Sequence, residues 1–206
     1  MGLTWRKRVN SSKLSVMKRR LLITICSIFL ISCNKNESNE NFEQLKEKFQ
    51  GKYEVISSIS EDAVDLNMDR ITSTDLLSEN PEISNSGLEL RLINDNEQLF
   101  EEKWPVETIV IPKGEIFDST NYYPTYSIYY SLYCNPISCQ FEDDYKSIHL
   151  LGDIQQNSTN TLISMESITI EENETIKVIT IRKLYSMKGW IRTKIESRYK
   201  RYTTIT

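Results

Sequence analysis

Apolar and polar side chains alternate along most of this chain, and this period of two is the feature that most constrains its fold. After Gly51, the residues Tyr53, Val55 and Ile59 alternate with more polar neighbours, as in a strand that is buried on one face only. Similar segments follow at 88–92, 107–111, 126–134, 147–151, 161–170, 175–185 and 190–202. Turn-forming Asn, Pro and Gly residues separate them. The pattern predicts an all-β protein of about eight antiparallel strands, arranged as a barrel or a sandwich.

A short helix is expected before the first strand. Phe42, Leu45 and Phe49 recur at intervals of three and four residues, and Gly51 ends this pattern. No segment alternates strands with long helices, which excludes a parallel α/β domain. We therefore expect a single all-β domain over residues 42–206.

The N-terminal region has the composition of a targeting signal. Residues 1–32 include basic side chains but no Asp or Glu, and an apolar run over residues 21–31 follows a basic triplet. A helix of that length covers about half of a hydrocarbon core of about 30 Å, so the run is too short to span a bilayer. The sequence predicts a signal peptide over residues 1–32, in which residues 1–16 are either an extended n-region or precede the true start at Met17.

The end of this signal resembles the lipobox of bacterial lipoproteins, where a Cys follows two apolar residues and a small one. Leu30, Ile31, Ser32 and Cys33 fit that pattern. The resemblance implies that Cys33 receives lipid and anchors the cleaved protein to a membrane. A plain secretory signal with an incidental Cys is the alternative. Residues 33–41 predict a flexible tether.

The absence of an Asp directly after Cys33 bears on location. Because the best-known retention signal for the inner membrane is missing, we expect a protein of the cell envelope that is anchored to the outer membrane. Its orientation, periplasmic or surface-facing, stays open.

Composition narrows the classes of function. The chain has 206 residues, with 29 Asp and Glu against 25 Lys and Arg, and a net charge of −4. Because many basic residues lie in the signal, the remainder is strongly acidic, which argues against a nucleic-acid partner. The only His, His149, is expected to be an ordinary strand residue, and the acidic run 142–144 a solvated turn. With no Gly-x-Ser-x-Gly turn either, we expect a protein that is not an enzyme.

The mature region resembles the lipocalin-like lipoproteins of Gram-negative envelopes. Gly51-Lys52-Tyr53 opens the first strand as Gly-x-Trp does in lipocalins, residues 64–77 resemble a loop-and-helix insert of that group, and residues 190–202 resemble the closing strand. The resemblance implies a barrel of about eight strands with a short helix in its first loop. It also implies that Arg201 packs over Tyr53, which replaces the family's Trp, and closes one end of the barrel.

Oxygen-bearing side chains in this insert have the spacing of a calcium loop. The residues concerned are Asp65, Asn67 and Asp69, with Ser73 at the ninth loop position. In a calcium loop the chain curls around the ion, so that oxygens from alternate residues converge on it. The Gly and Glu expected at the sixth and twelfth positions are missing here, and the predicted affinity is therefore weak. The alternative is a polar loop leading into a short helix that Thr72 or Ser73 caps, with Asp75 at its positive end.

Cys134 and Cys139 flank a segment that contains Asn135 and Pro136. In an oxidising compartment such a pair usually bonds, and the turn-forming residues predict a tight hairpin whose ends the disulfide joins. A redox-active pair is the alternative, although the spacing is not Cys-x-x-Cys.

Tyrosines are concentrated before and within the segment 126–134. Tyr126 and Tyr130 share one predicted face, and we expect them to line a cavity that offers hydroxyl groups to a ligand. Simple filling of the barrel is the alternative. Asp118-Ser119-Thr120 resembles the O-glycosylation tripeptide of some Gram-negative envelope proteins, so Ser119 is a candidate acceptor, with an unmodified loop as the alternative.

Together these expectations describe a membrane-anchored lipoprotein whose barrel binds a small apolar or amphipathic ligand. The alternative is a structural or interaction subunit of the envelope whose barrel is filled by its own side chains and whose surface contacts another protein. A ligand-sized cavity inside the barrel would distinguish the two.

Overall fold

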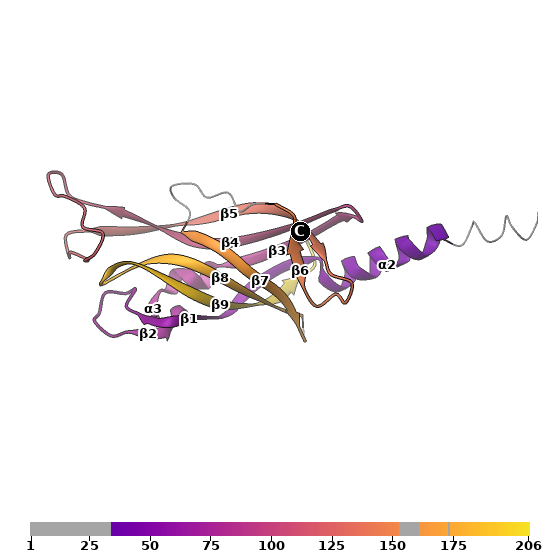
Figure 1. Cartoon of the computed structure of the whole chain (residues 1–206), viewed down its shortest axis with the longest axis horizontal. Coiled ribbons are helices and arrows are strands. Elements are labelled where there is room, and N and C mark those ends of the chain that lie inside the picture. Colours follow the sequence, from indigo (N-terminus) through magenta and orange to yellow (C-terminus); the bar gives the residue numbers. More distant parts are fainter. Residues whose placement is uncertain (1–33, 153–160, 173) are drawn as a thin grey trace, which may run out of the picture. The chain divides into compact units, whose positions relative to one another are not determined.

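The computed structural model describes residues 34–152, 161–172 and 174–206. The predicted signal peptide and Cys33 lie outside these residues. The elements, in chain order, are α2 (Asn34–Phe49), β1 (Gly51–Val64), β2 (Ser73–Asp75), α3 (Leu76–Glu79), the 3-10 helix η1 (Pro81–Asn85), β3 (Gly87–Asn94), β4 (Glu97–Val110), β5 (Ser127–Phe141), β6 (Ile148–Leu150), β7 (Leu162–Glu171), β8 (Thr175–Ser186) and β9 (Gly189–Thr203) (Figure 1).

The chain divides into two units after Gln44, and the second unit, Leu45–Thr206, holds every described strand. Helix α2 begins at Asn34 and so includes the segment 34–41 that the sequence predicts as a tether. None of the described helices is both long enough and apolar enough to cross a bilayer.

The strands form one antiparallel sheet that curls into a nearly closed barrel. Their order is β6-β5-β4-β3-β1-β9-β8-β7, and the short β2 pairs with β1 outside this path. The two ends of the sheet meet where Ser147 bridges Thr169 and the backbone N–H of Ile170 donates to the carbonyl of Lys146 at 2.7 Å. The predicted all-β antiparallel barrel of about eight strands is therefore confirmed.

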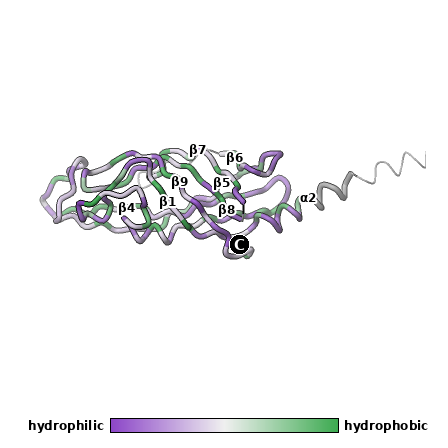
Figure 2. The backbone as a smooth tube through the Cα atoms, turned by 90° about the horizontal axis from the view of Figure 1, so that it is seen from below, coloured by the Kyte–Doolittle hydropathy of each residue, from purple (hydrophilic) through white to green (hydrophobic). Residues whose placement is uncertain are grey.

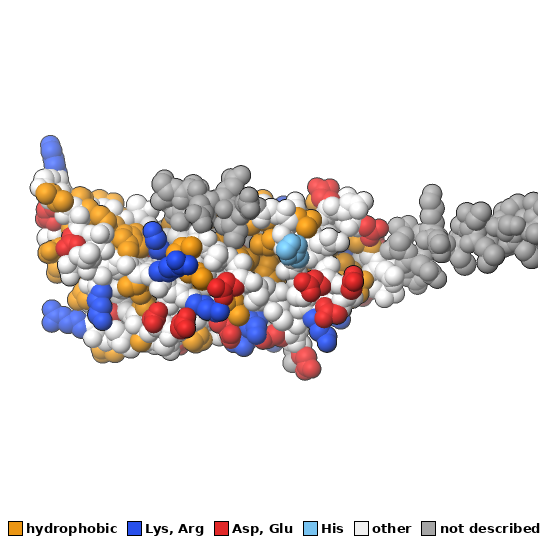
Figure 3. Space-filling view, in the orientation of Figure 1, with side chains coloured by type: hydrophobic (Ala, Val, Ile, Leu, Met, Phe, Trp, Pro, Cys, Tyr) orange, Lys and Arg blue, Asp and Glu red, His pale blue; other side chains and the backbone are white. Residues whose placement is uncertain are grey.

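Alternation along the strands separates the interior of the barrel from its surface. On β9, Ile195, Ser197 and Tyr199 are buried, whereas Lys194 and Lys200 are exposed. The backbone coloured by hydropathy shows the same change of character from residue to residue along the strands (Figure 2). Acidic and basic side chains are interspersed over the face of the barrel seen in Figure 3. This distribution is that of a sheet with one face in the core and the other in water.

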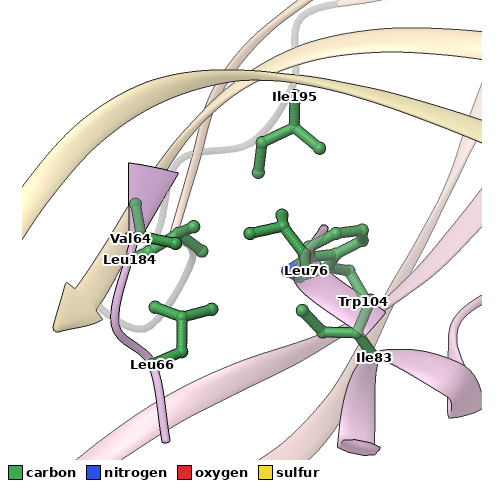
Figure 4. Packing of buried hydrophobic residues seen from close by; sticks show 7 residues of the cluster. All are labelled: Val64, Leu66, Leu76, Ile83, Trp104, Leu184 and Ile195. Carbon is green, nitrogen blue, oxygen red and sulfur yellow. The ribbon is translucent and has the colours of Figure 1, made fainter. Parts of the chain in front are cut away.

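The insert after β1 packs part of its length into the barrel. Asp75 is the N-cap of α3 and accepts the backbone N–H of Leu77 at 3.1 Å, so the predicted short helix exists, but Asp75 caps it instead of Thr72 or Ser73. The buried apolar cluster that joins the insert to the strands comprises Val64, Leu66, Leu76, Ile83, Trp104, Leu184 and Ile195 (Figure 4). Leu76 and Ile83 thus tie α3 and η1 to the core.

The predicted hairpin between Cys134 and Cys139 is wrong, because β5 runs without a break through both residues. Asn135 and Pro136 pair with consecutive residues of β4. Five residues of extended chain span about 16 Å, whereas the Cα atoms of a disulfide lie about 4.4–6.8 Å apart. Cys134 is moreover exposed and Cys139 buried, and both thiols are free. The predicted disulfide is therefore corrected: an extended strand holds the two cysteines apart.

Candidate functional site

A charged network lies inside the barrel. Arg182 of β8 forms an ion pair with Glu102 of β4, and their side chains are 2% and 5% exposed. The hydroxyl of Tyr199 on β9 donates to the second carboxylate oxygen of Glu102 at 2.8 Å, and Nε of Arg182 donates to the hydroxyl of Thr180 at 3.2 Å. Cζ of Arg182 also lies 4.2 Å from the centre of the Trp104 ring, which is a cation–π contact.

The charges and hydrogen-bonding groups of this network satisfy one another. Burial and the negative charge of Glu102 hold the pKa of Tyr199 well above its ordinary value, so Tyr199 remains a neutral donor. Because Glu102 accepts from both Arg182 and Tyr199, each of its oxygens has a partner. A buried charge pair of this kind is tolerated only when further hydrogen bonds satisfy it.

A small cavity adjoins the network. The space that the centre of a water molecule could occupy there is about 20 Å³. It is lined by Phe100, Glu102, Trp104, Val106, Tyr133, Asn135, Ile137, Leu162, Met165 and Arg182. That volume suits about one water molecule, whereas sites for small organic ligands measure about 300–1,000 Å³. The cavity beside the charged network is therefore far smaller than such a ligand site.

Tyr126 is buried and Tyr130 half-buried, as expected for one inward face, but the small cavity beside the charged network is lined by other residues. Tyr126 lies before β5, where its hydroxyl accepts the backbone N–H of Asp118 and donates to the carbonyl of Ile116, both at 3.1 Å. Tyr130 is half-buried, and burial raises its pKa above the ordinary range. Neither tyrosine lines the cavity. The residues of β5 that do so are Tyr133, Asn135 and Ile137, which alternate along the strand.

Tyr53 and Arg201 do come together, at paired positions of β1 and β9. The buried hydroxyl of Tyr53 donates to the carbonyl of Phe49 at 2.5 Å. One guanidinium nitrogen of Arg201 donates to the carbonyls of Glu47 and Gln50 at 3.0 and 3.3 Å, and another pairs with Glu174. Arg201 thus satisfies carbonyls at the C-terminal end of α2, as basic side chains often do. Residues 47–53 and Arg201 together cover this end of the barrel.

Gly51 belongs to the same end of the barrel and has a conformation that other residues rarely adopt. Its φ is +148°, and a Cβ atom there would lie 2.2 Å from the carbonyl oxygen of Thr203. The close approach of β1 to β9 at this point therefore requires glycine. The Gly-x-Tyr motif read from the sequence is explained by this contact.

The oxygens of the predicted calcium loop bind the loop's own backbone. Asp65 accepts the N–H groups of Asp69 and Arg70 at 3.1 and 2.8 Å, Asn67 accepts that of Asp69 at 3.0 Å, and Asp69 accepts that of Ile71 at 2.7 Å. Ser73 lies in β2 and accepts the N–H of Asp75. Within the described ranges, no three His, Cys, Asp or Glu residues are grouped so that they could hold a metal ion. The hydrogen bonds favour the capped polar loop.

We expect Asp65→Ala to lower the free energy of unfolding by about 1–3 kcal/mol, since it leaves N–H groups of the loop without their acceptor. Asp65 is 4% exposed. Urea unfolding in EDTA and in 10 mM Ca²⁺ tests this, with the exposed Asp62→Ala as the control. The loss should be equal in both solutions. Stabilisation of the wild type by Ca²⁺ that disappears in Asp65→Ala would instead assign the loop to calcium.

The remaining predicted positions lie at the surface. Ser119 is exposed in the segment between β4 and β5, where its carbonyl accepts the backbone N–H of Trp190 at 3.0 Å. His149 and the acidic turn 142–144 line an open hollow of about 490 Å³ at the β5–β6 hairpin, together with Gln140 and Phe141. The structure thus places these side chains in contact with solvent and away from the charged network.

Neither family models, nor curated proteins, nor solved structures include a match to this chain.

Proposed function

We propose that this protein is a lipid-anchored, non-enzymatic subunit of the cell envelope that works through the outer surface of a filled barrel. The observation that carries the proposal is the occupied interior. Glu102, Arg182, Tyr199 and Trp104 meet there, and the cavity beside them measures about 20 Å³. A ligand of even modest size would have to displace paired charges, which is costly in a buried environment.

The competing function is the binding of a small apolar or amphipathic ligand within the barrel. Its support is the lining of the cavity, where apolar side chains such as Phe100, Ile137 and Met165 accompany the charged pair. We regard this function as the alternative because binding would require these side chains to move apart, and packed interiors resist such changes.

Mass spectrometry of the natively purified protein separates the two functions. We expect no small apolar molecule at a stoichiometry near one, because the cavity beside Glu102 and Arg182 is too small for it. Lipids that bind to the outside would be present in variable amounts and would be removed by detergent exchange. A single apolar species that stays at one copy per chain after exchange would support the ligand-binding alternative.

The anchor is proposed from the sequence around Cys33. Palmitate labelling followed by cell fractionation should place the wild type in the membrane pellet, whereas Cys33→Ala should remain unlabelled and leave the pellet. Cys26→Ala is the matched control, since this residue lies within the predicted signal peptide. If Cys33→Ala still labels and pellets, the proposed anchor is incorrect.

A further inference from the structure

The first half of β5 is an open edge of the sheet. Among the described strands, residues 127–138 pair with β4 only, and β6 covers the other side of β5 from Cys139 onward (Figure 1). The pairing with β4 runs without a register shift, so this part of β5 contains no bulge. Such an edge offers a row of main-chain N–H and C=O groups to a further strand.

The alternation of the strand decides which main-chain groups face the open side. The carbonyl of Ser138 accepts the N–H of Leu151 at 2.8 Å, on the side of β5 that β6 covers. The main-chain groups of Ser138 therefore point away from β4. Because these groups change sides from one residue to the next, Ile128, Tyr130 and Leu132 also direct their N–H and C=O groups to the open side.

Natural sheets usually protect an exposed edge with charged residues, a Pro or a bulge. The strand at the other end of the sheet, β7, has two register shifts, and its Glu166 forms an ion pair with Lys194. In the second half of β5, Pro136 has the parity of Ser138 and brings no N–H to the open side. Residues 127–135 have none of these protections, because they include no charged residue, no Pro and no bulge.

The composition of this edge indicates what can pair with it. The whole run 119–140 contains no Asp, Glu, Lys or Arg, although 26% of the chain is charged. Within it, Tyr129 and Leu132 are 61% and 51% exposed. A partner strand must therefore have an unprotected edge of its own and must cover uncharged side chains. The first half of β5 in a second copy of this chain meets both requirements.

We propose that two copies of this chain pair antiparallel through the first half of β5, about a two-fold axis at Tyr130. In this register Tyr130 faces its counterpart, and Ile128 faces Leu132 of the second copy. The two strands then exchange about six main-chain hydrogen bonds, because all three residues direct their groups to the open side. No like charges meet, since the segment has none.

The pairing goes beyond the proposed function, because it requires neither a lipid anchor nor a filled barrel. The two proposals can therefore fail separately. A contact through one short strand of each copy is small, so we expect a reversible dimer that dissociates on dilution.

Light scattering of the full chain in a mild detergent, over a range of concentrations, measures the dimer. Leu132→Pro removes an N–H on the open side and no hydrogen bond to β4. Because the two-fold axis doubles this loss, we expect the dissociation constant to rise by about 10- to 100-fold. Leu132→Ala is the matched control, since it shortens the side chain but keeps the N–H, and it should weaken the dimer at least about 5-fold less.

A distance measurement on Cys134 tests the register. This thiol is free and exposed, whereas Cys139 is buried, so Cys134 accepts a nitroxide label. Each Cys134 lies four residues from the proposed axis, which puts the two Cα atoms about 27 Å apart. Pulsed electron resonance should show a distance near this value that Leu132→Pro abolishes. Labelled Cys134→Ser identifies any signal from other cysteines.

A chain that stays monomeric at every concentration would overturn the proposal and would leave the edge to an extended segment of another protein. A dimer that Leu132→Pro weakens no more than Leu132→Ala does, or a label distance far from 27 Å, would overturn it as well. Should circular dichroism show that Leu132→Pro does not fold, Tyr130→Lys replaces it. That variant puts like charges opposite each other at the axis, and it should abolish the dimer.

Discussion

Glu102→Ala should lower the free energy of unfolding by about 3–5 kcal/mol, among the largest losses expected for a single substitution in this barrel. The variant leaves the guanidinium of Arg182 without its counter-ion at a position where that side chain is 2% exposed. It also removes the acceptor of the Tyr199 hydroxyl. Urea unfolding followed by circular dichroism measures the loss.

Two further variants show whether the loss arises from the unpaired charge. Glu166→Ala breaks an ion pair with Lys194 that is 37% and 46% exposed, and it should cost less than about 1 kcal/mol. The triple variant Glu102→Leu, Arg182→Met, Tyr199→Phe removes both charges of the network and the Tyr199 hydroxyl together, and it should recover most of the stability. A triple variant as unstable as Glu102→Ala would show that packing, and not charge, dominates.

Trp104→Ala should also cost about 3–5 kcal/mol, because it removes the largest side chain of the buried cluster and enlarges the neighbouring cavity. The variant additionally loses the contact between Arg182 and the ring. Added indole should restore part of the stability by occupying the space that the ring leaves, since apolar cavities accept small aromatic molecules. Thermal unfolding with and without indole measures both effects.

Leu132→Ala is the matched control for Trp104→Ala. Leu132 lies on the neighbouring strand β5 and is 51% exposed, so its truncation should change stability by less than about 0.5 kcal/mol. If the two variants lose equal stability, Trp104 does not organise the interior. If indole fails to stabilise Trp104→Ala, the core collapses into the space left by the ring.

Strands with one buried face could be predicted from the sequence, because such burial leaves a period of two. This holds for β1, β3, β7, β8 and β9, whose predicted segments overlap the observed strands. The resemblance to lipocalins, and no local pattern, implied that Tyr53 and Arg201 meet, and they do occupy paired positions of β1 and β9. Gly51 belongs to the same resemblance, and its backbone approaches β9 too closely for a Cβ atom.

The first half of β4 and the second half of β5 could not be predicted in this way. On β4 the inward positions include Gln98 and Glu102, and polar residues at such positions hide the alternation. On β5 the local turn signal at Asn135 and Pro136 indicates a hairpin. Pro136 is accommodated because β5 pairs there with β4 only, among the described strands, and an edge tolerates a missing N–H.

The sequence by itself determined the all-β class and the positions of most strands along the chain, because these depend on the polarity of neighbouring residues. Only the tertiary structure placed a charged network and a cavity of about 20 Å³ together inside the barrel. Glu102 and Arg182 are 80 residues apart, and each is acceptable in the interior only because the other is there. No local sequence pattern indicates that these two residues pair. The cavity beside them is lined by side chains from four strands, so its volume depends on the assembled fold.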